Sequence, residues 1–257
     1  MVGYGIAPQG QKGYETMSDT QTPTTPIGWH RHPNGGGKVQ DSASVAETAF
    51  VGVNACVSGY ATVSGNACVF DYATVADYAT VHDSATVSGN ATVAGNARVS
   101  GNAWLYGKAK VYDKAKVCGN AWLYDNARVY DDARVYGKAK VCGDAWLYGN
   151  ARVFGNARVY DDARVYGKAK VCGNARVSDS ATVAGNARVS GNAWLYDKAK
   201  VCGDAWLYGN ARVYGSACVY DNAKVCGDAC VYYYARVFGN AWVSGTTRVS
   251  GNDVVDA

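Results

Sequence analysis

A strict six-residue period is the feature that most constrains this chain. Between Ala97 and Val171 the sequence repeats a unit of Ala, a variable residue, Val or Leu, a variable residue, Gly or Asp, and a polar residue, with no insertion or deletion. Every sixth residue from Val39 to Val255 is also Val or Leu. Such short units cannot bury an apolar face alone, so the period predicts a solenoid in which successive units stack.

The same period predicts which side chains point inward. Within a unit, the Ala and the aliphatic residue are two positions apart, so they share one side of a short extended segment and their neighbours point outward. Gly or Asp followed by Asn, Asp, Lys or Ser predicts a corner, because these residues tolerate positive φ or hydrogen-bond their own backbone. An α-helix is excluded, since a six-residue repeat fits neither helical period and Gly recurs too often.

The units AWLYGN, ARVSGN and ATVAGN resemble the hexapeptide repeats of left-handed parallel β-helix proteins. The resemblance extends from Val39 to Val255 and implies an all-β, single-stranded, triangular solenoid with three units, or 18 residues, per coil. The entry Gly35-Gly36-Gly37 before Val39 resembles that of bacterial and phage hexapeptide proteins labelled as transferases. Trimers with parallel axes are what this resemblance implies for assembly.

Two parts are predicted along the chain. Residues 1–38 are expected to be a flexible N-terminal segment or cap, in which Trp29 packs over the first coil. The alternative that His30 and His32 ligate a metal stays open, although no third ligand is evident nearby. Residues 39–257 are expected to form one β-helix of about 12 coils, because 216 residues separate Val39 from Val255. At about 4.8 Å per coil, the rod would be roughly 58 Å long.

Charge and cysteine content narrow the class of protein. The net charge of +4 is unevenly spread, since residues 97–240 hold 21 Lys or Arg against 12 acids. No apolar run is long enough for a transmembrane helix or signal-peptide core, so we expect no membrane association and a cytoplasmic or virion-associated protein. None of the nine cysteines lies 18 residues from another, which excludes a disulfide ladder in this register. We therefore expect reduced thiols, no cofactor and no metal.

Folding the sequence into 18-residue coils aligns cations on one face. The predicted cationic row consists of six consecutive residues, Arg98, Lys116, Arg134, Arg152, Lys170 and Arg188. Like charges about 5 Å apart repel one another, so the row would be stabilised by a bound anion. Asp113, Asp131 and Asp132 at the adjoining corner are expected to offset part of the charge. Before this row the outward positions are small, and Thr is scattered over three faces, which disfavours an ice-binding surface.

Aromatic residues align on the other two faces. One is predicted to stack Tyr112, Tyr130, Tyr148 and Tyr166, and the other to place Trp104 and Trp122 beside Tyr106 and Tyr124. So many outward rings either stabilise parallel strands or form an interface with another subunit. A corner column of Asn residues, interrupted once by Lys138, is expected to be structural, with hydrogen bonds along the stack; its members are Asn102, Asn120, Asn156, Asn174, Asn192 and Asn210.

Three functions follow from these patterns. We predict a non-enzymatic structural or interaction protein, a rigid rod that self-associates as a trimer or end to end, or presents a binding surface. The first alternative is a polyanion binder, for nucleic acid or a phosphorylated ligand, that uses the cationic row with adjacent Tyr and Trp. The second alternative is an acyltransferase-like enzyme, for which the repeats offer one His, His82, and no inserted loop. No catalytic residue is assigned.

Overall fold

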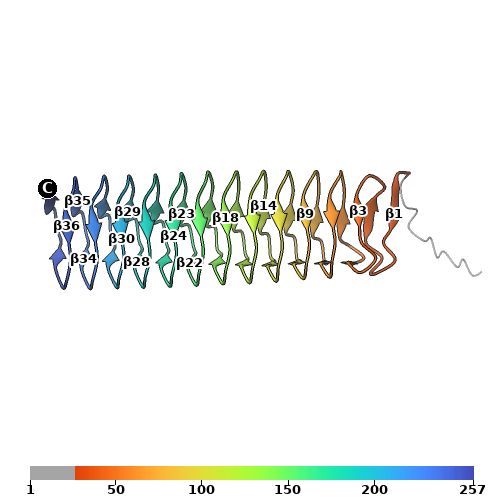
Figure 1. Cartoon of the computed structure of the whole chain (residues 1–257), viewed down its shortest axis with the longest axis horizontal. Coiled ribbons are helices and arrows are strands. Elements are labelled where there is room, and N and C mark those ends of the chain that lie inside the picture. The colour runs from red at the N-terminus through yellow and green to blue at the C-terminus, as the bar shows by residue number, and fades with distance from the viewer. Residues whose placement is uncertain (1–26) are drawn as a thin grey trace, which may run out of the picture.

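The computed structural model describes residues 27–257 as a straight solenoid of parallel coils (Figure 1). Its strands form three sheets of 14, 12 and 12 members that run along the rod. Each residue pairs with the one 18 positions later, as Val99 does with Val117 and Val117 with Val135. The predicted all-β solenoid with 18 residues per coil and about 12 coils is therefore confirmed.

The tyrosine face is the sheet of 14 strands. Its members are β1 (Trp29–Arg31), β2 (Lys38–Gln40), β5 (Cys56–Val57), β8 (Thr74–Val75), β11 (Thr92–Val93), β14 (Lys110–Val111), β17 (Arg128–Val129), β20 (Trp146–Leu147), β23 (Arg164–Val165), β26 (Thr182–Val183), β29 (Lys200–Val201), β32 (Cys218–Val219), β35 (Arg236–Phe238) and β38 (Val254–Asp256).

The cationic face is one sheet of 12 strands. Its members are β3 (Ser44–Val45), β6 (Thr62–Val63), β9 (Thr80–Val81), β12 (Arg98–Val99), β15 (Lys116–Val117), β18 (Arg134–Val135), β21 (Arg152–Val153), β24 (Lys170–Val171), β27 (Arg188–Val189), β30 (Trp206–Leu207), β33 (Lys224–Val225) and β36 (Trp242–Val243).

The tryptophan face is the other sheet of 12 strands. Its members are β4 (Phe50–Val51), β7 (Cys68–Val69), β10 (Thr86–Val87), β13 (Trp104–Leu105), β16 (Trp122–Leu123), β19 (Lys140–Val141), β22 (Arg158–Val159), β25 (Arg176–Val177), β28 (Trp194–Leu195), β31 (Arg212–Val213), β34 (Cys230–Val231) and β37 (Arg248–Val249).

The core is a single column of small and aliphatic side chains. Every inward Ala, Val and Leu from Ala49 to Ala241 is fully buried, and these residues form one continuous cluster. Burying each Val side chain contributes about 1.5 kcal/mol or more, before the entropy of ordering the chain is subtracted. Three strands converge on a narrow axis, so each coil alternates Ala with a branched residue, and Leu is the largest fully buried side chain among residues 27–257.

The corners require positive φ and use it in two ways. At Gly155 φ is 72°, and an added Cβ would lie 3.1 Å from the backbone nitrogen of Gly173 in the next coil. Asp131 has φ of 56°, and its Oδ2 accepts a hydrogen bond of 2.8 Å from the backbone N–H of Gly149. An Asp corner therefore ties one coil to the next through its side chain, which a Gly corner cannot do.

The Asn column makes the predicted hydrogen bonds along the stack. Asn156 donates to Asn174 at 3.1 Å, and Asn174 donates to Asn192 at 3.0 Å. The bonds continue from Asn192 to Asn210 at 3.0 Å and also join Asn102 to Asn120 at 3.3 Å. Lys138 separates the two runs, as the sequence indicated. This column is structural and stabilises the parallel register.

An antiparallel hairpin covers the first coil. Strand β1 pairs with β2 so that Trp29 lies opposite Gln40, and Gly36 forms an antiparallel bridge with Gly52. The Asn34 side chain donates to the carbonyl of Ala49 at 3.0 Å. Within the segment predicted as flexible or capping, residues 29–38 thus form an ordered cover for a strand edge that would otherwise be unpaired. Residues 1–26 of that segment lie outside the described residues.

Candidate functional site

The structure places the six residues of the cationic row on one strand position of the cationic face. Arg98 pairs with Lys116, Lys116 with Arg134, and Arg152 with Lys170. The remaining contacts of the row, Arg134 with Arg152 and Lys170 with Arg188, have the same register. Neighbouring cations therefore start from strands about 4.8 Å apart. All but the half-buried Lys170 are exposed.

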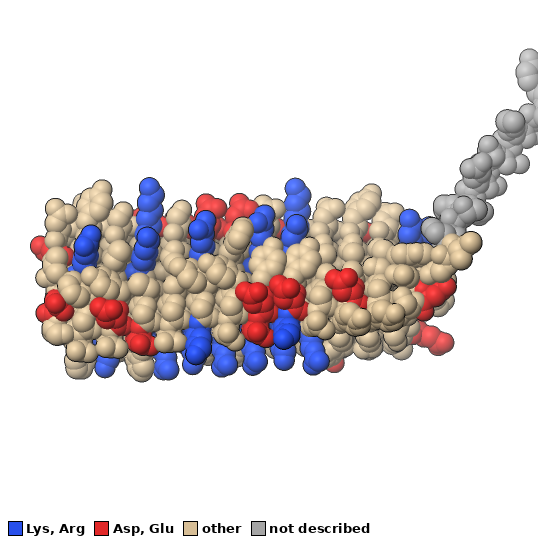
Figure 2. Space-filling view, turned by 90° about the horizontal axis from the view of Figure 1, so that it is seen from above, with Lys and Arg blue, Asp and Glu red and all other residues tan. Residues whose placement is uncertain are grey.

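No carboxylate neutralises this row within the described part of the chain. Among residues 27–257, the only pairs within 4.0 Å join a His to an Asp, and no Lys or Arg takes part. Arg31 is the one Lys or Arg side chain in this range that donates a hydrogen bond to the protein. The middle of the rod consequently presents bare basic side chains, which are sparse near the N-terminal coils (Figure 2).

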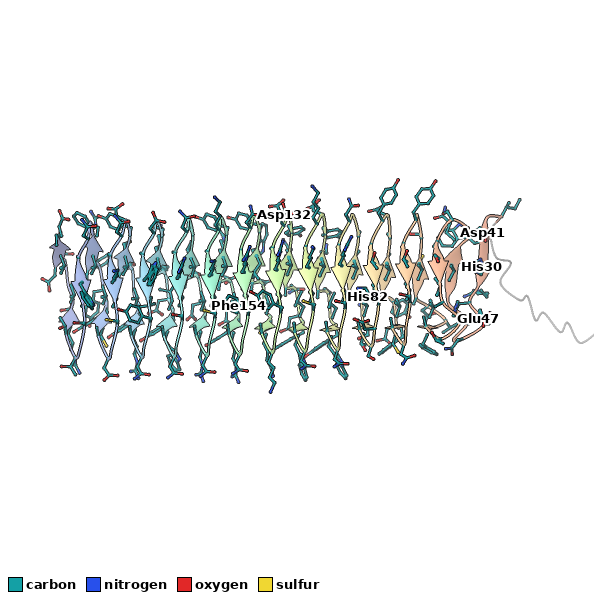
Figure 3. All side chains as sticks on the ribbon, viewed as in Figure 1. His30, Asp41, Glu47, His82, Asp132 and Phe154 are labelled. Carbon is teal, nitrogen blue, oxygen red and sulfur yellow. The ribbon has the colours of Figure 1, made fainter. Side chains whose placement is uncertain are left out.

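The acids expected to offset the row have a different role. Asp113 and Asp131 turn their carboxylates along the rod, and the backbone amides of Asp131 and Gly149 donate to them at 3.4 and 2.8 Å. Asp132 projects outward from the corner, away from the body of the rod (Figure 3). Among residues 27–257, no ion pair within 4.0 Å joins these acids to the row, because the positive-φ corner directs the Asp113 and Asp131 carboxylates to backbone N–H groups.

A groove runs beside the C-terminal half of the row. It has a volume of about 440 Å³ and is lined by Asn150, Arg152, Lys168, Lys170, Asn186, Arg188 and Asp204. Four cations thus face one carboxylate, and that carboxylate accepts a hydrogen bond of 2.8 Å from the Asn186 side chain. Sequence reasoning missed Lys168, which lies in the corner column; folding the corner positions into 18-residue coils would have placed it beside Lys170.

The aromatic residues stack on one another along the rod. Ring centroids are 5.7 Å apart for Trp104 and Trp122, and the rings are 13° from parallel. The same arrangement recurs in the other predicted pairs, with centroid distances of 5.1 Å for Tyr106 and Tyr124, 5.5 Å for Tyr112 and Tyr130, and 4.8 Å for Tyr148 and Tyr166. Each ring covers a face of its neighbour, so these rows contribute to stacking of the coils.

This stacking also concerns the rings beside the cationic row. Tyr136 and Phe154 lie 4.9 Å apart and 1° from parallel, and Phe154 lies on the outer surface of the rod (Figure 3). Because the two rings cover each other, each keeps only one face on which a nucleobase could stack, and the rest of the row offers no further ring between Cys118 and Cys172. The chemistry of the cationic face is therefore mainly that of charge.

At the C-terminal end of the cationic face and on the tryptophan face, Trp side chains separate the cations. Trp206 lies between Arg188 at 4.7 Å and Lys224 at 5.8 Å, measured from the charged group to the ring centroid. Trp194 lies in the same way between Arg176 and Arg212, at 4.7 and 5.8 Å. Cation–π contact stabilises such alternating rows. The cationic row has one such contact, at Arg188, and its first five members have none within the described residues.

Thiols and one imidazole on the cationic face are the groups that could act in catalysis. Burial raises the pKa of the Cys118 and Cys172 thiols despite nearby Lys and Arg, so both stay protonated and poorly nucleophilic near neutral pH. His82 Nδ1 lies 3.2 Å from Asp83 Oδ2 on the cationic face. His82, the one His of the repeats, thus has a neighbouring carboxylate that can orient its ring.

The two N-terminal His residues do not converge. His30 Nδ1 lies 2.9 Å from Asp41 Oδ1 at the end of the rod (Figure 3). His32 is buried, and its Nδ1 accepts from the backbone N–H of Asn34 at 3.3 Å. Residues 27–257 contain no group of three His, Cys, Asp or Glu side chains arranged to hold a metal ion. In the same range no helix could span a membrane.

Comparison with known proteins identifies the repeat. The family model described as "YdcK Beta solenoid repeat" matches residues 85–101, 121–137, 127–143, 157–170, 169–185 and 205–221. Among solved structures, UDP-N-acetylglucosamine O-acyltransferase (LpxA) from Moraxella catarrhalis RH4 is similar over 74% of this chain and 69% of its own, at 10% identity and a TM-score of 0.41. No curated protein matches the chain.

Proposed function

Because the chain is a β-solenoid of hexapeptide repeats, we propose that it acts as a rigid, non-enzymatic rod that presents its cationic face to a linear polyanion. One observation carries the proposal: six cations follow one another at consecutive coils, and no carboxylate of residues 27–257 lies within 4.0 Å of them. Polar side chains would keep this face soluble without placing like charges on six consecutive coils, so solubility alone does not account for the row. A polyanion laid along the rod removes their mutual repulsion and releases its own counterions.

The arrangement favours recognition by charge alone. The cations repeat at about 4.8 Å, a spacing set by the strands and not by any one polymer. Lys and Arg side chains are long enough to reach anionic groups at other spacings. Both a nucleic acid strand and a sulfated polysaccharide fit this chemistry, and affinity for either is expected to fall steeply with salt.

The test compares two sets of three cations on different faces. Lys116→Gln with Arg134→Gln and Arg152→Gln removes half of the cationic row, whereas Lys140→Gln with Arg158→Gln and Arg176→Gln removes the same charge from the tryptophan face. Binding of a labelled 30-nucleotide DNA strand and of heparin is measured by fluorescence anisotropy at several salt concentrations. For the first variant we expect at least a tenfold loss of affinity. For the DNA, the slope of log affinity against log salt concentration should be smaller in magnitude by about 2.

The control variant is expected to lose much less affinity. It removes a run of three cations instead of part of a run of six, and Trp122 and Trp194 contact two of the three. Equal losses in both variants would mean that net charge alone attracts polyanions and would reject the cationic face. Retained heparin binding with lost DNA binding, or the reverse, identifies which polymer uses the row.

Self-association through the tryptophan face completes the proposed function. A groove of about 370 Å³ is lined there by Phe70, Asp71, Thr86, Ser88, Gly89, Trp104, Tyr106, Gly107 and Trp122. Trp104 and Trp122 are 47% and 36% exposed, and no Lys or Arg lines the groove, although Lys140 Nζ lies 4.5 Å from the centroid of the Trp122 ring. A second copy of the chain would bury these rings. Trp104→Ala with Trp122→Ala should reduce the mass measured by light scattering, whereas Trp194→Ala, a ring between two cations, should not.

Acyl transfer is the second candidate, and the His82–Asp83 pair favours it. A His oriented by a carboxylate is the usual general base for removing a proton from an acceptor hydroxyl or amine. Hydrolysis and transfer from acetyl-coenzyme A should be assayed with the wild type and His82→Gln. Turnover that His82→Gln abolishes would replace the structural proposal. Polyanion binding that is unchanged in His82→Gln would show that the two functions are separable.

A further inference from the structure

One segment of the chain occurs twice in identical form on the same faces. Residues 91–106 and 181–196 both read ATVAGNARVSGNAWLY, and the offset of 90 positions between them corresponds to five coils. Thr92 and Thr182 therefore occupy the same row of the tyrosine face. Their neighbours differ: Thr92 pairs with Thr74 and Lys110, whereas Thr182 pairs with Arg164 and Lys200. The second copy alone places a small residue between two cations.

This gap in the row opens the largest groove described here outside the cationic face. It has a volume of about 690 Å³ and is lined by Tyr148, Asp162, Arg164, Tyr166, Ser180, Thr182, Lys198, Lys200, Ser216 and Cys218. Thr182 lies between the two cations of the row, while Lys198 reaches the groove from an adjoining corner, where it follows Asp162 and Ser180 at 18-residue steps. We refer to this groove as the Thr182 notch.

The cations of the notch have no partner among residues 27–257. Arg164, Lys198 and Lys200 form no ion pair, and none of the cation–π contacts involves them. Three cations thus face one carboxylate, that of Asp162, across a floor of hydroxyl groups. Such a surface is suited to an anion with several oxygens.

The dimensions fit one tetrahedral anion. Arg164 and Lys200 start two coils apart, or about 10 Å along the rod. Donors that hydrogen-bond to opposite sides of a phosphoryl group are about 8 Å apart, since each bond is about 2.9 Å long and the oxygens are about 2.5 Å apart. Two flexible side chains can converge over that distance, and the Thr182 hydroxyl lies between them.

An uncharged residue stands on each side of the Arg164–Lys200 pair. Trp146 precedes Arg164 and Cys218 follows Lys200, so the next cations of this row, Arg128 and Arg236, each lie two coils from the pair. Tyr166 stacks on Tyr148 at 4.8 Å, but the next residue of its row is Ala184, so one ring face has no aromatic partner. The notch therefore combines an anion site with an adjacent ring face.

We propose that the Thr182 notch binds a small phosphomonoester, with the phosphoryl group between Arg164, Lys200 and Lys198 and its organic part against Tyr166. The site is separate from the cationic row and takes one ligand per chain. It does not depend on polyanion binding, since the two sites use different faces of the rod.

Two matched substitutions test the proposal. Thr182→Trp fills the notch without adding charge, with the side chain that the same row carries at Trp146, and Thr92→Trp makes the same change in the identical segment, where Thr74 stands in place of Arg164. Binding of phenyl phosphate and of inorganic phosphate is measured by isothermal titration calorimetry, with circular dichroism to verify the fold. We expect saturable 1:1 binding of phenyl phosphate to the wild type, a loss of affinity of more than tenfold in Thr182→Trp, and no change in Thr92→Trp.

Further variants keep the result decisive. Arg164→Gln with Lys200→Gln removes the charges without filling the notch and should also weaken binding more than tenfold. The variant of the cationic row, Lys116→Gln with Arg134→Gln and Arg152→Gln, should bind phenyl phosphate as the wild type does. No saturable binding, equal loss in Thr92→Trp, or full binding by Arg164→Gln with Lys200→Gln would overturn the proposal. Equal affinity for both probes would overturn the role given to Tyr166.

Discussion

The coils of residues 39–96 and those of residues 97–240 have the same interior and different exteriors. On the cationic face, Thr62 and Thr80 precede Arg98 and Lys116 in one continuous row, and all four stand beside a fully buried Val. The backbone register does not change where the row changes from Thr to Arg. The fold is therefore specified by the inward positions, and the outward rows are free to acquire charge.

A buried charge should be equally harmful in both regions. Val63→Asp and Val153→Asp each place a carboxylate in a fully buried position of the same column. Burial of an unpaired charge costs several kcal/mol, so both variants should lose cooperative unfolding or fail to fold. Circular dichroism and thermal melts check this. If only one variant unfolds, the two regions do not share one core.

The corners should also respond alike. Gly65 and Gly155 have φ of 66° and 72°, and an added Cβ would meet the backbone of the next coil at 2.9 and 3.1 Å. Gly65→Ala and Gly155→Ala should each lower the free energy of unfolding by about 1–2 kcal/mol, the cost of a left-handed conformation for an L residue. Denaturant melts measure this, with Ser64→Ala as a control at a neighbouring outward position. A neutral Gly155→Ala would separate the two regions.

Extending the cationic row into the neutral coils should show that the outward rows of the two regions differ in their sensitivity to salt. Thr62→Lys with Thr80→Lys would continue the row into the neutral coils and create like-charged neighbours with Arg98. Each new pair should destabilise the rod by about 0.2–1 kcal/mol at low salt, and the effect should disappear at high salt because it is electrostatic. Thr62→Gln with Thr80→Gln controls for side-chain length. A destabilisation that persists in 0.5 M salt would point to packing instead.

The smallest expected effect is on the stability of the rod at low pH, through the Asp83 carboxylate. The amide of Gly101 and then the side chain of His82 hydrogen-bond the Asp83 carboxylate and hold its pKa below the ordinary value. A lowered folded-state pKa stabilises the protein above the ordinary pKa of Asp, and this contribution is lost as pH falls through the folded-state pKa. NMR titration should place the Asp83 midpoint below that of a model peptide, and Asp83→Asn should flatten the acid limb slightly. An ordinary midpoint would contradict the hydrogen bond.

The sequence predicted the axial arrangement of the rod well because the period fixes it. Once Val39 and Val45 set the phase, the row from Arg98 to Arg188 and the Asn column follow by counting. The hairpin of Trp29 and Gln40 could not be predicted, since residues 27–38 lack the period. The bonding of Asp131 to Gly149 was missed because it depends on the direction of a side chain at positive φ. The Thr182 notch was missed because it arises where one small residue stands between Arg164 and Lys200. A consensus of the repeats does not show such a difference between neighbouring coils.

The 18-residue register also decides what a change of length does to the surface. The stretch ARVYDDARVYGKAKVCG occurs at residues 127–143 and again at 157–173, a shift of 30 residues, or one coil and two sides. The same letters therefore face different directions, whereas the copies at 91–106 and 181–196 keep theirs. Inserting one hexapeptide would rotate every downstream side chain by a third of a turn while leaving the core intact. Adding a full coil to this rod would lengthen it and keep every row aligned. Adding one or two hexapeptides would instead change which outward residues become neighbours.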